Sequence, residues 1–331
     1  MIIRKSAYYD DFVCLAAACP DSCCKEWDVQ VDPDAAEFYR SLPGSLGDRL
    51  REVLVEEDGE TVMTIIDRRC PMWRRDGLCR IQAELGHDAL CKTCREFPRL
   101  THDYGDFVEK GLELSCPEAA RLILSKPYTP PLTCEVDGGE APEYGAEAMD
   151  VLLRTRQEAL CLLNERQSVP EALVLLLMYG YHAQALLDGE EDSPFDPDAA
   201  LEEARQFAGQ SAALQAFFLG LEILTEDWRA LLSAPLCPDL WQEAHRRMAC
   251  YFVERYWLQA VSDYDLVSRV KLAIVSCLLV RSLGSDVLRT AQLYSKEIEN
   301  DADNVDAILD SAYTHPALTD AALLGALLKG E

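Results

Sequence analysis

The sequence predicts a mostly α-helical protein with a small α+β Cys-rich metal-binding module at its N-terminus and a helical C-terminal part. Nine of the 14 cysteines lie between Cys14 and Cys116. Prolines and glycines are concentrated in residues 126–143, and the hydrophobic period beyond them is helical. We therefore expect a Cys-rich module at residues 1–125, a linker at 126–143 and an all-helical domain at 144–331.

Short strands and helices alternate in the N-terminal part. Alternating apolar and polar residues predict a strand at 27–32, and β-branched residues predict another at 61–66. Ser115 is placed to cap a helix that follows it, Pro117 suits the first turn, and Glu118 favours the positive helix end. The other elements expected here are helices at 34–39, 47–55 and 80–90 and a strand at 107–114.

Apolar residues at helical spacing run through most of the remaining chain. No fixed-period repeat is visible, so a bundle or layer of helices is favoured over a solenoid. The expected helical segments are 151–163, 172–187, 201–207, 212–224, 241–260, 266–283, 287–298 and 318–328.

The chain is strongly acidic, with 58 Asp and Glu against 31 Lys and Arg and a net charge of −27. This argues against a protein whose main task is to bind nucleic acid, which needs a basic surface. It also argues against docking on anionic lipid. No apolar stretch is long enough to span a membrane, and the first residues lack the apolar region of a signal peptide. We therefore expect a cytoplasmic protein that binds neither nucleic acid nor membrane.

The clustered cysteines are the most informative feature of the sequence. In a reducing compartment, such thiols indicate metal or redox chemistry more often than disulfides. Eight or nine thiols exceed a single zinc site, which takes four ligands. They fit one iron–sulfur cluster with additional cysteines, two clusters, or a pair of zinc sites, and spacing leaves these open. The spacing is Cys14-x4-Cys19-x3-Cys23-Cys24, then Cys70-x8-Cys79, Cys91-x2-Cys94 and Cys116.

A basic segment accompanies these cysteines. Residues 68–99 carry eight Lys or Arg and four Asp or Glu, a net charge of +4 in an acidic chain. Nearby cations lower thiol pKa and stabilise a negatively charged metal centre. The alternative is a loop of arginines that face solvent.

The cysteines beyond the cluster have a different setting. Cys161, Cys237, Cys250 and Cys277 lie singly in mostly apolar segments, where a free cysteine behaves as a small buried hydrophobic residue. We expect none of these four to be a metal ligand.

Several enzyme classes lack support because their motifs are missing. Cys19-x3-Cys23 is followed at once by Cys24, so the Cys-x3-Cys-x2-Cys spacing of radical enzymes is absent. The sequence contains no GxGxxG, no GxxxxGK[ST] and no HExxH. The five histidines are scattered, and His102, the nearest to the cysteines, is more simply a solvated loop residue.

Three ordered blocks contain most of the clustered cysteines. They are residues 12–32, FVCLAAACPDSCCKEWDVQVD, residues 70–99, CPMWRRDGLCRIQAELGHDALCKTCREFPR, and residues 112–121, LELSCPEAAR. In this order and spacing they resemble the opening, second and third blocks of the flagellin lysine-N-methylase family. The resemblance covers about residues 8–125, and the rest of the chain matches in length only. Met72-Trp73 departs from the Phe-Leu-like pair of the family, which bears on packing rather than on metal ligation.

This resemblance implies S-adenosylmethionine-dependent methylation of lysine ε-amino groups on flagellin or another Lys-bearing protein. It also implies a Cys-bound iron–sulfur cluster, with 4Fe-4S as the first expectation and zinc as the alternative. Cys91 matches less well and is an optional ligand. The ligands implied by position are Cys14, Cys19, Cys23, Cys24, Cys70, Cys79, Cys94 and Cys116.

Arg95 and Arg99 are candidates for cofactor binding, because paired guanidinium hydrogen bonds can hold a carboxylate or phosphate. They could equally balance cluster charge or cap a helix. The sequence assigns no catalytic residue, including the base that would deprotonate lysine. Two other functions stay open: a non-enzymatic zinc or iron module, and an electron carrier that uses the cluster alone.

Overall fold

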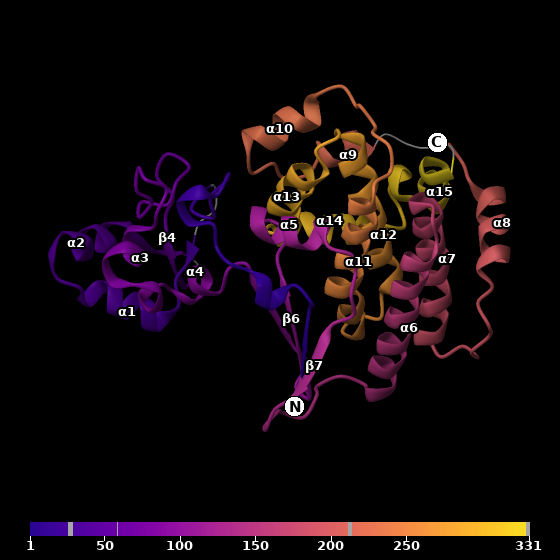
Figure 1. Cartoon of the computed structure of the whole chain (residues 1–331), viewed down its shortest axis with the longest axis horizontal. Coiled ribbons are helices and arrows are strands. Elements are labelled where there is room, and N and C mark those ends of the chain that lie inside the picture. The colour runs from indigo at the N-terminus through magenta and orange to yellow at the C-terminus, as the bar shows by residue number, and fades with distance from the viewer. Residues whose placement is uncertain (26–28, 58, 211–213, 329–331) are drawn as a thin grey trace.

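The computed structural model describes residues 1–25, 29–57, 59–210 and 214–328. A small N-terminal lobe, which includes residues 29–57 and 59–96, lies beside a larger helical body (Figure 1). Helices, counting the short 3-10 turns, make up 56% of the described residues and the sheets are small, which confirms a mostly α protein with some β structure.

The small lobe is built on a three-stranded antiparallel sheet with the order β2-β4-β3. Asp32 caps the first helix by accepting a hydrogen bond from the Ala35 amide at 3.1 Å. Tyr39 and Leu50 are fully buried in a core that belongs to this lobe. Its elements are β2 (Val29–Gln30), α1 (Pro33–Ser41), α2 (Gly44–Val53), β3 (Leu54–Glu57), β4 (Glu60–Met63), α3 (Arg80–Leu85) and α4 (Lys92–Glu96).

A second sheet connects the chain on either side of the lobe. It has the order β5-β6-β1-β7, with β1 parallel to β6 and antiparallel to β7. The segment expected to be a linker, 126–143, differs from that expectation because it supplies β7. The strands are β1 (Ile2–Lys5), β5 (Arg99–Asp103), β6 (Phe107–Leu112) and β7 (Leu132–Glu135).

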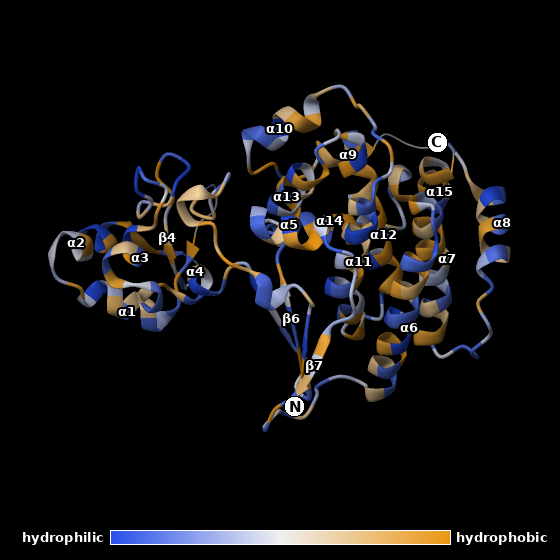
Figure 2. Ribbon diagram, viewed as in Figure 1, coloured by the Kyte–Doolittle hydropathy of each residue, from blue (hydrophilic) through white to orange (hydrophobic). Residues whose placement is uncertain are grey.

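The helical body is organised around α12 (Leu266–Ser282), which is buried at nearly every position. A helix that is buried on all sides belongs in a core, and Figure 2 shows the apolar residues concentrated among these helices. The core also includes Phe12, Phe107 and α5 (Pro117–Ser125). The other helices are α6 (Ala146–Glu165), α7 (Val169–Leu187), α8 (Pro197–Phe207), α9 (Leu214–Phe218), α10 (Glu226–Ser233), α11 (Glu243–Tyr256), α13 (Val287–Ile298), α14 (Ala302–Ser311) and α15 (Asp320–Leu328).

Some element boundaries differ from those expected. The N-cap of α5 is Cys116 rather than Ser115, so the predicted cap was wrong by one residue. The helix expected at 80–90 ends at Leu85 because Gly86 adopts a φ of 90°. The strand expected at 27–32 contains β2, whereas Trp27 and Asp28 lie outside the described residues. In the part of the chain that the structure describes, no helix is both long and apolar enough to cross a membrane.

His245 generates a prediction about acid stability. It is fully buried near the start of α11, and its Nδ1 accepts a hydrogen bond from the Gln242 amide at 3.0 Å. Burial lowers the pKa of His245 to about 4. Because histidine in the unfolded chain titrates near 6.5, the unfolded state takes up the proton first as the pH falls. This contribution to stability is complete above about pH 6.5 and is lost towards pH 4, by about 3 kcal/mol.

Urea unfolding of the wild type and His245→Asn between pH 4 and pH 7.5 tests this prediction. The asparagine can still accept from the Gln242 amide but cannot take up a proton. The variant should therefore lose less unfolding free energy than the wild type over this range. Equal losses in the two proteins would contradict the assignment.

Candidate metal centre

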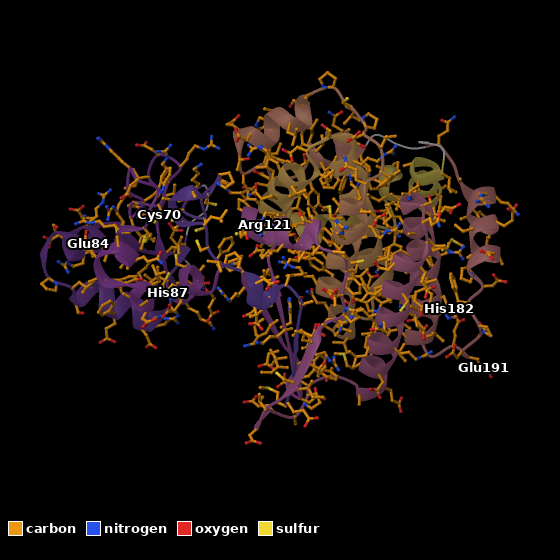
Figure 3. The ribbon with its side chains drawn as sticks, in the orientation of Figure 1. Cys70, Glu84, His87, Arg121, His182 and Glu191 are labelled. Atoms are coloured by element: carbon orange, nitrogen blue, oxygen red, sulfur yellow. The ribbon has the colours of Figure 1, made fainter. Side chains whose placement is uncertain are left out.

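A cleft of about 360 Å³ separates the small lobe from the adjacent end of the helical body. Figure 3 places Cys70 and His87 in the small lobe and Arg121, on α5, in the body opposite them. Cys70 and the optional Cys91 do not line the cleft, although both are buried beside it in the lobe. Seven of the eight predicted ligands line it: Cys14, Cys19, Cys23, Cys24, Cys79, Cys94 and Cys116.

The first cysteine loop, residues 14–24, is attached to the helical body through Asp21. The Asp21 Oδ2 accepts from Lys296 Nζ and Gln292 Nε2, both at 3.2 Å and both on α13. Burial alone would raise the pKa of Asp21, but the charge of Lys296 and the Ser22 amide outweigh it, so the pKa is lowered. The carboxylate therefore stays ionised and holds the loop against α13.

Backbone hydrogen bonds hold the first cysteine loop, residues 14–24, next to the segment that contains Cys70. The Cys70 amide donates to the Cys24 carbonyl at 2.8 Å, next to a bridge between Lys25 and Arg69. This places Cys24 and Cys70 side by side although 46 positions separate them in the sequence. A thiol contact between them lowers the pKa of Cys70.

Three cysteines occupy the same position in their local structures. Cys79, Cys91 and Cys116 are the N-cap residues of α3, α4 and α5. Burial raises the pKa of Cys79 and Cys116, and the amides of the first turn of the following helix act in the opposite direction. Such amides stabilise a thiolate, and a thiolate is the form that binds metal.

Sulfur–sulfur contacts connect the cysteines into one set. The Cys94 thiol donates to Cys91, which lowers the pKa of Cys91 to about 7 although burial opposes the shift. A thiol contact with Cys24 raises the pKa of Cys23. Cys19 and Cys23 both raise the pKa of Cys116 by charge, so they lie close enough to interact with it. The sulfurs of the lobe and of α5 therefore meet at the same cleft.

The donor set fits a soft metal centre. All 14 cysteines are among the described residues and all are free thiols. Within the described residues, no group of three or more Cys, His, Asp or Glu side chains is already arranged to hold a single ion. Sulfur-only donors are the ligands of zinc and of iron–sulfur clusters, and the thiols must lose protons when metal binds. The eight predicted ligands and Cys91 remain predictions.

Cations surround the cysteines, as the basic segment suggested. Arg95 and Arg99 both line the cleft. The Arg95 guanidinium lies 3.4 Å from the Leu90 carbonyl, and the Arg99 guanidinium lies over the Phe12 ring at 5.2 Å. Their role in cofactor binding remains a prediction.

Sequence reasoning missed residues that the fold adds to the cleft. Lys296 lies on α13 and Asn300 just after it, about 180 positions from Cys116, and no sequence pattern pointed to them. His87 lines the cleft, whereas His102, the histidine considered from sequence, lies in β5 and lines a different cavity.

The four cysteines that were expected not to bind metal, Cys161, Cys237, Cys250 and Cys277, do not line the cleft. Cys250 and Cys277 are buried, as expected for small hydrophobic residues. Cys161 and Cys237 are exposed, so the expectation that they would be buried was wrong for these two.

The sequence is similar to curated proteins from Salmonella. It is 29% identical over 235 residues to "Lysine-N-methylase" from Salmonella choleraesuis (strain SC-B67) and, to the same extent, to that of Salmonella typhimurium. That match covers 67% of this chain and 56% of each relative, so the chain spans about half of their length. It is also 32% identical over 132 residues to "Flagellar biosynthetic protein FliU" from Salmonella muenchen, covering 38% of this chain and 78% of the relative.

Neither a family model nor a solved structure matches the chain.

The separation between the cleft and the later cysteines leads to a prediction about metal content. Replacing Cys161, Cys237, Cys250 and Cys277 together with Ala should leave bound iron and zinc unchanged. The cost in stability should come from the two buried positions, at roughly 1 kcal/mol or more each, and little should come from the exposed pair. Cys24→Ser with Cys70→Ser is the comparison variant and should lose metal.

Elemental analysis and urea unfolding measure the two effects separately. Loss of metal from a folded quadruple variant would place a ligand in the helical body and contradict the prediction.

Proposed function

The chain belongs to the lysine-N-methylase family, and from this premise we propose that it methylates lysine side chains of a partner protein in the cytoplasm. Flagellin is the first candidate partner, because a relative is named as a flagellar biosynthetic protein. S-adenosylmethionine is the proposed methyl donor, and a cluster held by the cleft cysteines is the proposed metal cofactor.

The observation that carries this proposal is the open, thiol-lined cleft between the lobe and the body. Its volume of about 360 Å³ falls within the range of small-molecule sites, roughly 300–1,000 Å³. A purely structural metal site would be closed by its protein ligands, whereas a catalytic site keeps room for another molecule. A bound cluster and a donor molecule would share the volume beside the cysteines.

A bound iron–sulfur cluster would supply iron that can hold a ligand at an open coordination position. The residues that would hold it are those of the predicted ligand set, with Cys91 placed beside Cys94. Arg95 and Arg99 would face the anionic groups of the donor, since guanidinium groups bind carboxylates in pairs of hydrogen bonds. The Asp21 contact with α13 would keep the cysteine loop in position while the substrate binds.

A lysine must lose a proton before its nitrogen can attack a methyl group, since its ordinary pKa is about 10.4. Two carboxylates at the cleft are poor bases because each is paired with a cation. Asp21 contacts Lys296, and Glu118 accepts from Arg121 at 2.7 and 2.8 Å, which lowers the pKa of Glu118. His87 lines the same cleft, and a neutral imidazole nitrogen can act as a general base towards a group within hydrogen-bonding reach. We assign His87 as the candidate base.

Cluster content gives the first test. Protein purified without oxygen should be brown and should contain iron and acid-labile sulfide, because the sulfur-only donor set exceeds one zinc site. Iron and sulfide analysis measures this, with Cys161→Ser plus Cys237→Ser as a control that keeps both values. A colourless protein with stoichiometric zinc, even after anaerobic supply of iron and sulfide, would leave zinc as the metal.

Methyl transfer gives the second test. Co-expression with flagellin from the same genome should add roughly 14 Da per methyl group to flagellin lysines, which act as the nucleophile. The additions should vanish with Cys23→Ser plus Cys24→Ser and persist with Cys161→Ser plus Cys237→Ser. His87→Gln should slow the additions without changing the iron content.

Intact-mass and peptide mass spectrometry record the result. Unmodified flagellin, with no other lysine-methylated protein in the cells, would favour the non-enzymatic metal module.

A further inference from the structure

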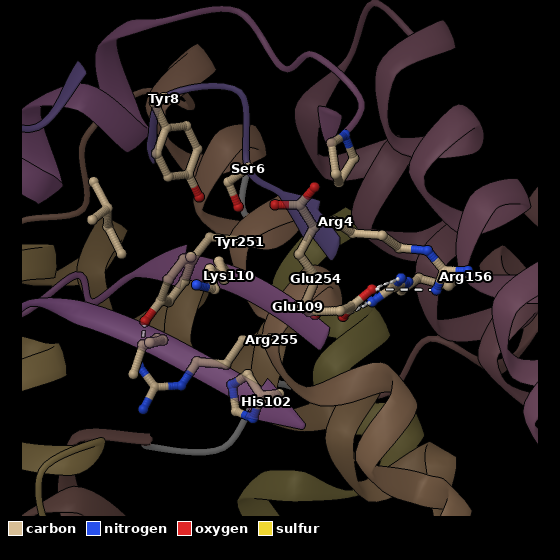
Figure 4. A pocket seen from close by; sticks show the side chains of 14 residues that line it. Arg4, Ser6, Tyr8, His102, Glu109, Lys110, Arg156, Tyr251, Glu254 and Arg255 are labelled. Carbon is tan, nitrogen blue, oxygen red and sulfur yellow. Dashed lines mark hydrogen bonds and ion pairs between the residues drawn. The ribbon is translucent and has the colours of Figure 1, made fainter. Parts of the chain in front are cut away.

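A second cavity, separate from the cysteine cleft, lies at the other end of α5, and Cys250 on α11 is one of its lining residues. Its volume is about 290 Å³. It is enclosed by Tyr8 from the N-terminal segment, residues 126–129, which follow α5, and α11. Tyr8, Tyr251 and Glu254 also line a smaller adjoining cavity of about 40 Å³, which Figure 4 shows from close by.

Glu254 is an acid without a cation of its own. Its Oε1 is buried and meets no donor at full hydrogen-bonding distance among the described residues, although the Tyr128 and Ser6 hydroxyls are close enough to lower the pKa of its carboxyl group. In Figure 4 the Glu254 carboxylate points towards the side where Ser6 and Tyr8 lie. A buried carboxylate left unpaired is costly, so a native structure that keeps one calls for an explanation.

The cations near Glu254 form hydrogen bonds or ion pairs with other groups. Arg156 forms two hydrogen bonds with Glu109, at 2.6 and 2.7 Å, in the arrangement that Figure 4 marks with dashed lines. Two further cations line the cavity: Lys126 is paired with Asp11, and Arg247 donates to the Leu124 carbonyl at 2.7 Å. None of these three described cations forms an ion pair with the Glu254 carboxylate, although Lys126 and Arg247 line the same cavity.

Burial raises the pKa of Glu254 to about 7, while Arg156 lowers it and Glu109 raises it. The Tyr128 and Ser6 hydroxyls also lower it. A cation bound in the cavity would favour the ionised form of the Glu254 carboxylate. The buried position of this carboxylate in the cavity wall is consistent with such a role.

The walls of the cavity select the kind of cation. Tyr8, Tyr128 and Tyr251 are aromatic, and Ile123 and Pro127 are apolar. Aromatic faces attract organic ammonium groups, and apolar walls suit an alkyl chain. A metal ion needs several oxygen ligands, and one carboxylate is a poor set for it. The volume is just below the small-molecule range of roughly 300–1,000 Å³, which suits one side chain better than a nucleotide-sized molecule.

We propose that this cavity binds the alkylammonium group of a lysine-type side chain on the partner protein, with Glu254 as its charge partner and Tyr8 and Tyr128 as aromatic walls. The inference rests on the proposed function, which makes a Lys-bearing protein the substrate.

The cavity is distinct from the cysteine cleft. Pro117 and Glu118 at one end of α5 line the cleft, and Ile123, with Lys126 just past the other end, lines this cavity. The six helical steps from Pro117 to Ile123 span about 9 Å, which is longer than one lysine side chain. The lysine held here is therefore a recognition or product lysine, not the one reacting beside the cysteines.

Calorimetry at pH 8 tests the proposal directly on the full-length protein. Nα-acetyl-lysine methylamide and its ε-trimethyl form are the probes, and the uncharged Nα-acetyl-norleucine methylamide is the control ligand. Binding of at least one cationic probe is expected, with none of the norleucine compound. Tighter binding of the trimethyl form would mark the cavity as a product site, and tighter binding of lysine as a substrate site.

Variants then locate the binding. Glu254→Gln should weaken the amine at least tenfold, and its melting temperature at pH 8 should be unchanged or higher because a buried charge is removed. Tyr128→Leu should weaken binding severalfold, whereas Tyr128→Phe should retain it because the ring is kept. Glu202→Gln, at an exposed position of α8 that lines neither the cavity nor the cleft, is the control and should bind as the wild type does.

Failure of this inference and failure of the proposed function give different results. Equal amine affinity in the wild type and Glu254→Gln, or binding of norleucine as tight as that of lysine, would overturn the inference whatever the methylation assay shows. Binding of S-adenosylmethionine that Glu254→Gln abolishes, with no amine binding, would assign the cavity to the donor and overturn it too. Unmethylated flagellin would overturn the proposed function alone, because amine binding is measured without it.

Discussion

The contact of Asp21 with α13 is the interaction on which the candidate site depends. The small lobe has its own core, and the body has another, so packing alone does not fix the cysteine loop between them. Lys296 and Gln292 reach from α13 to the Asp21 carboxylate and set where the loop lies. A partly buried, hydrogen-bonded ion pair is costly to break because it leaves a charge unpaired. The position of Cys19, Cys23 and Cys24 relative to Cys116 follows from that contact.

The helical body contains a buried carboxylate, Glu299, whose hydrogen-bond partners come from the fold itself. Glu299 is buried among partners that satisfy it: Arg255 at 3.1 Å, Tyr251 at 3.1 and 3.2 Å, and Tyr256 at 3.0 Å. Glu254 neighbours Arg255 in the sequence, yet its Oε1 has no such partner among the described residues. The two buried acids therefore differ in their hydrogen bonding. Glu299 is fully satisfied, as a structural group should be, whereas Glu254 has an oxygen that is available to a ligand.

Local features were predictable from the sequence, and contacts between distant segments were not. Helix α13 begins and ends at the predicted residues because Asp286 caps it and its apolar period is regular. The candidate cysteines were identified from their close spacing in the sequence, because such spacing is typical of thiols that bind one metal centre. By contrast, β7 joins β1 across about 130 residues, and no local pattern marks such a pairing. Lys296 was missed for the same reason: its role comes from tertiary packing and not from its neighbours in the chain.

Helix α5 connects the cysteine cleft to the second cavity. Its N-cap is Cys116, so its first turn belongs to the cysteine cleft, and the chain just past its last turn encloses the second cavity. It packs against α11, which carries Glu254, and against α13, which carries Lys296. A rigid helix held on both sides keeps the distance between its ends constant. A partner protein that places one lysine in each site must match that distance, so selectivity would come from the spacing of lysines on the partner as well as from the chemistry of either site.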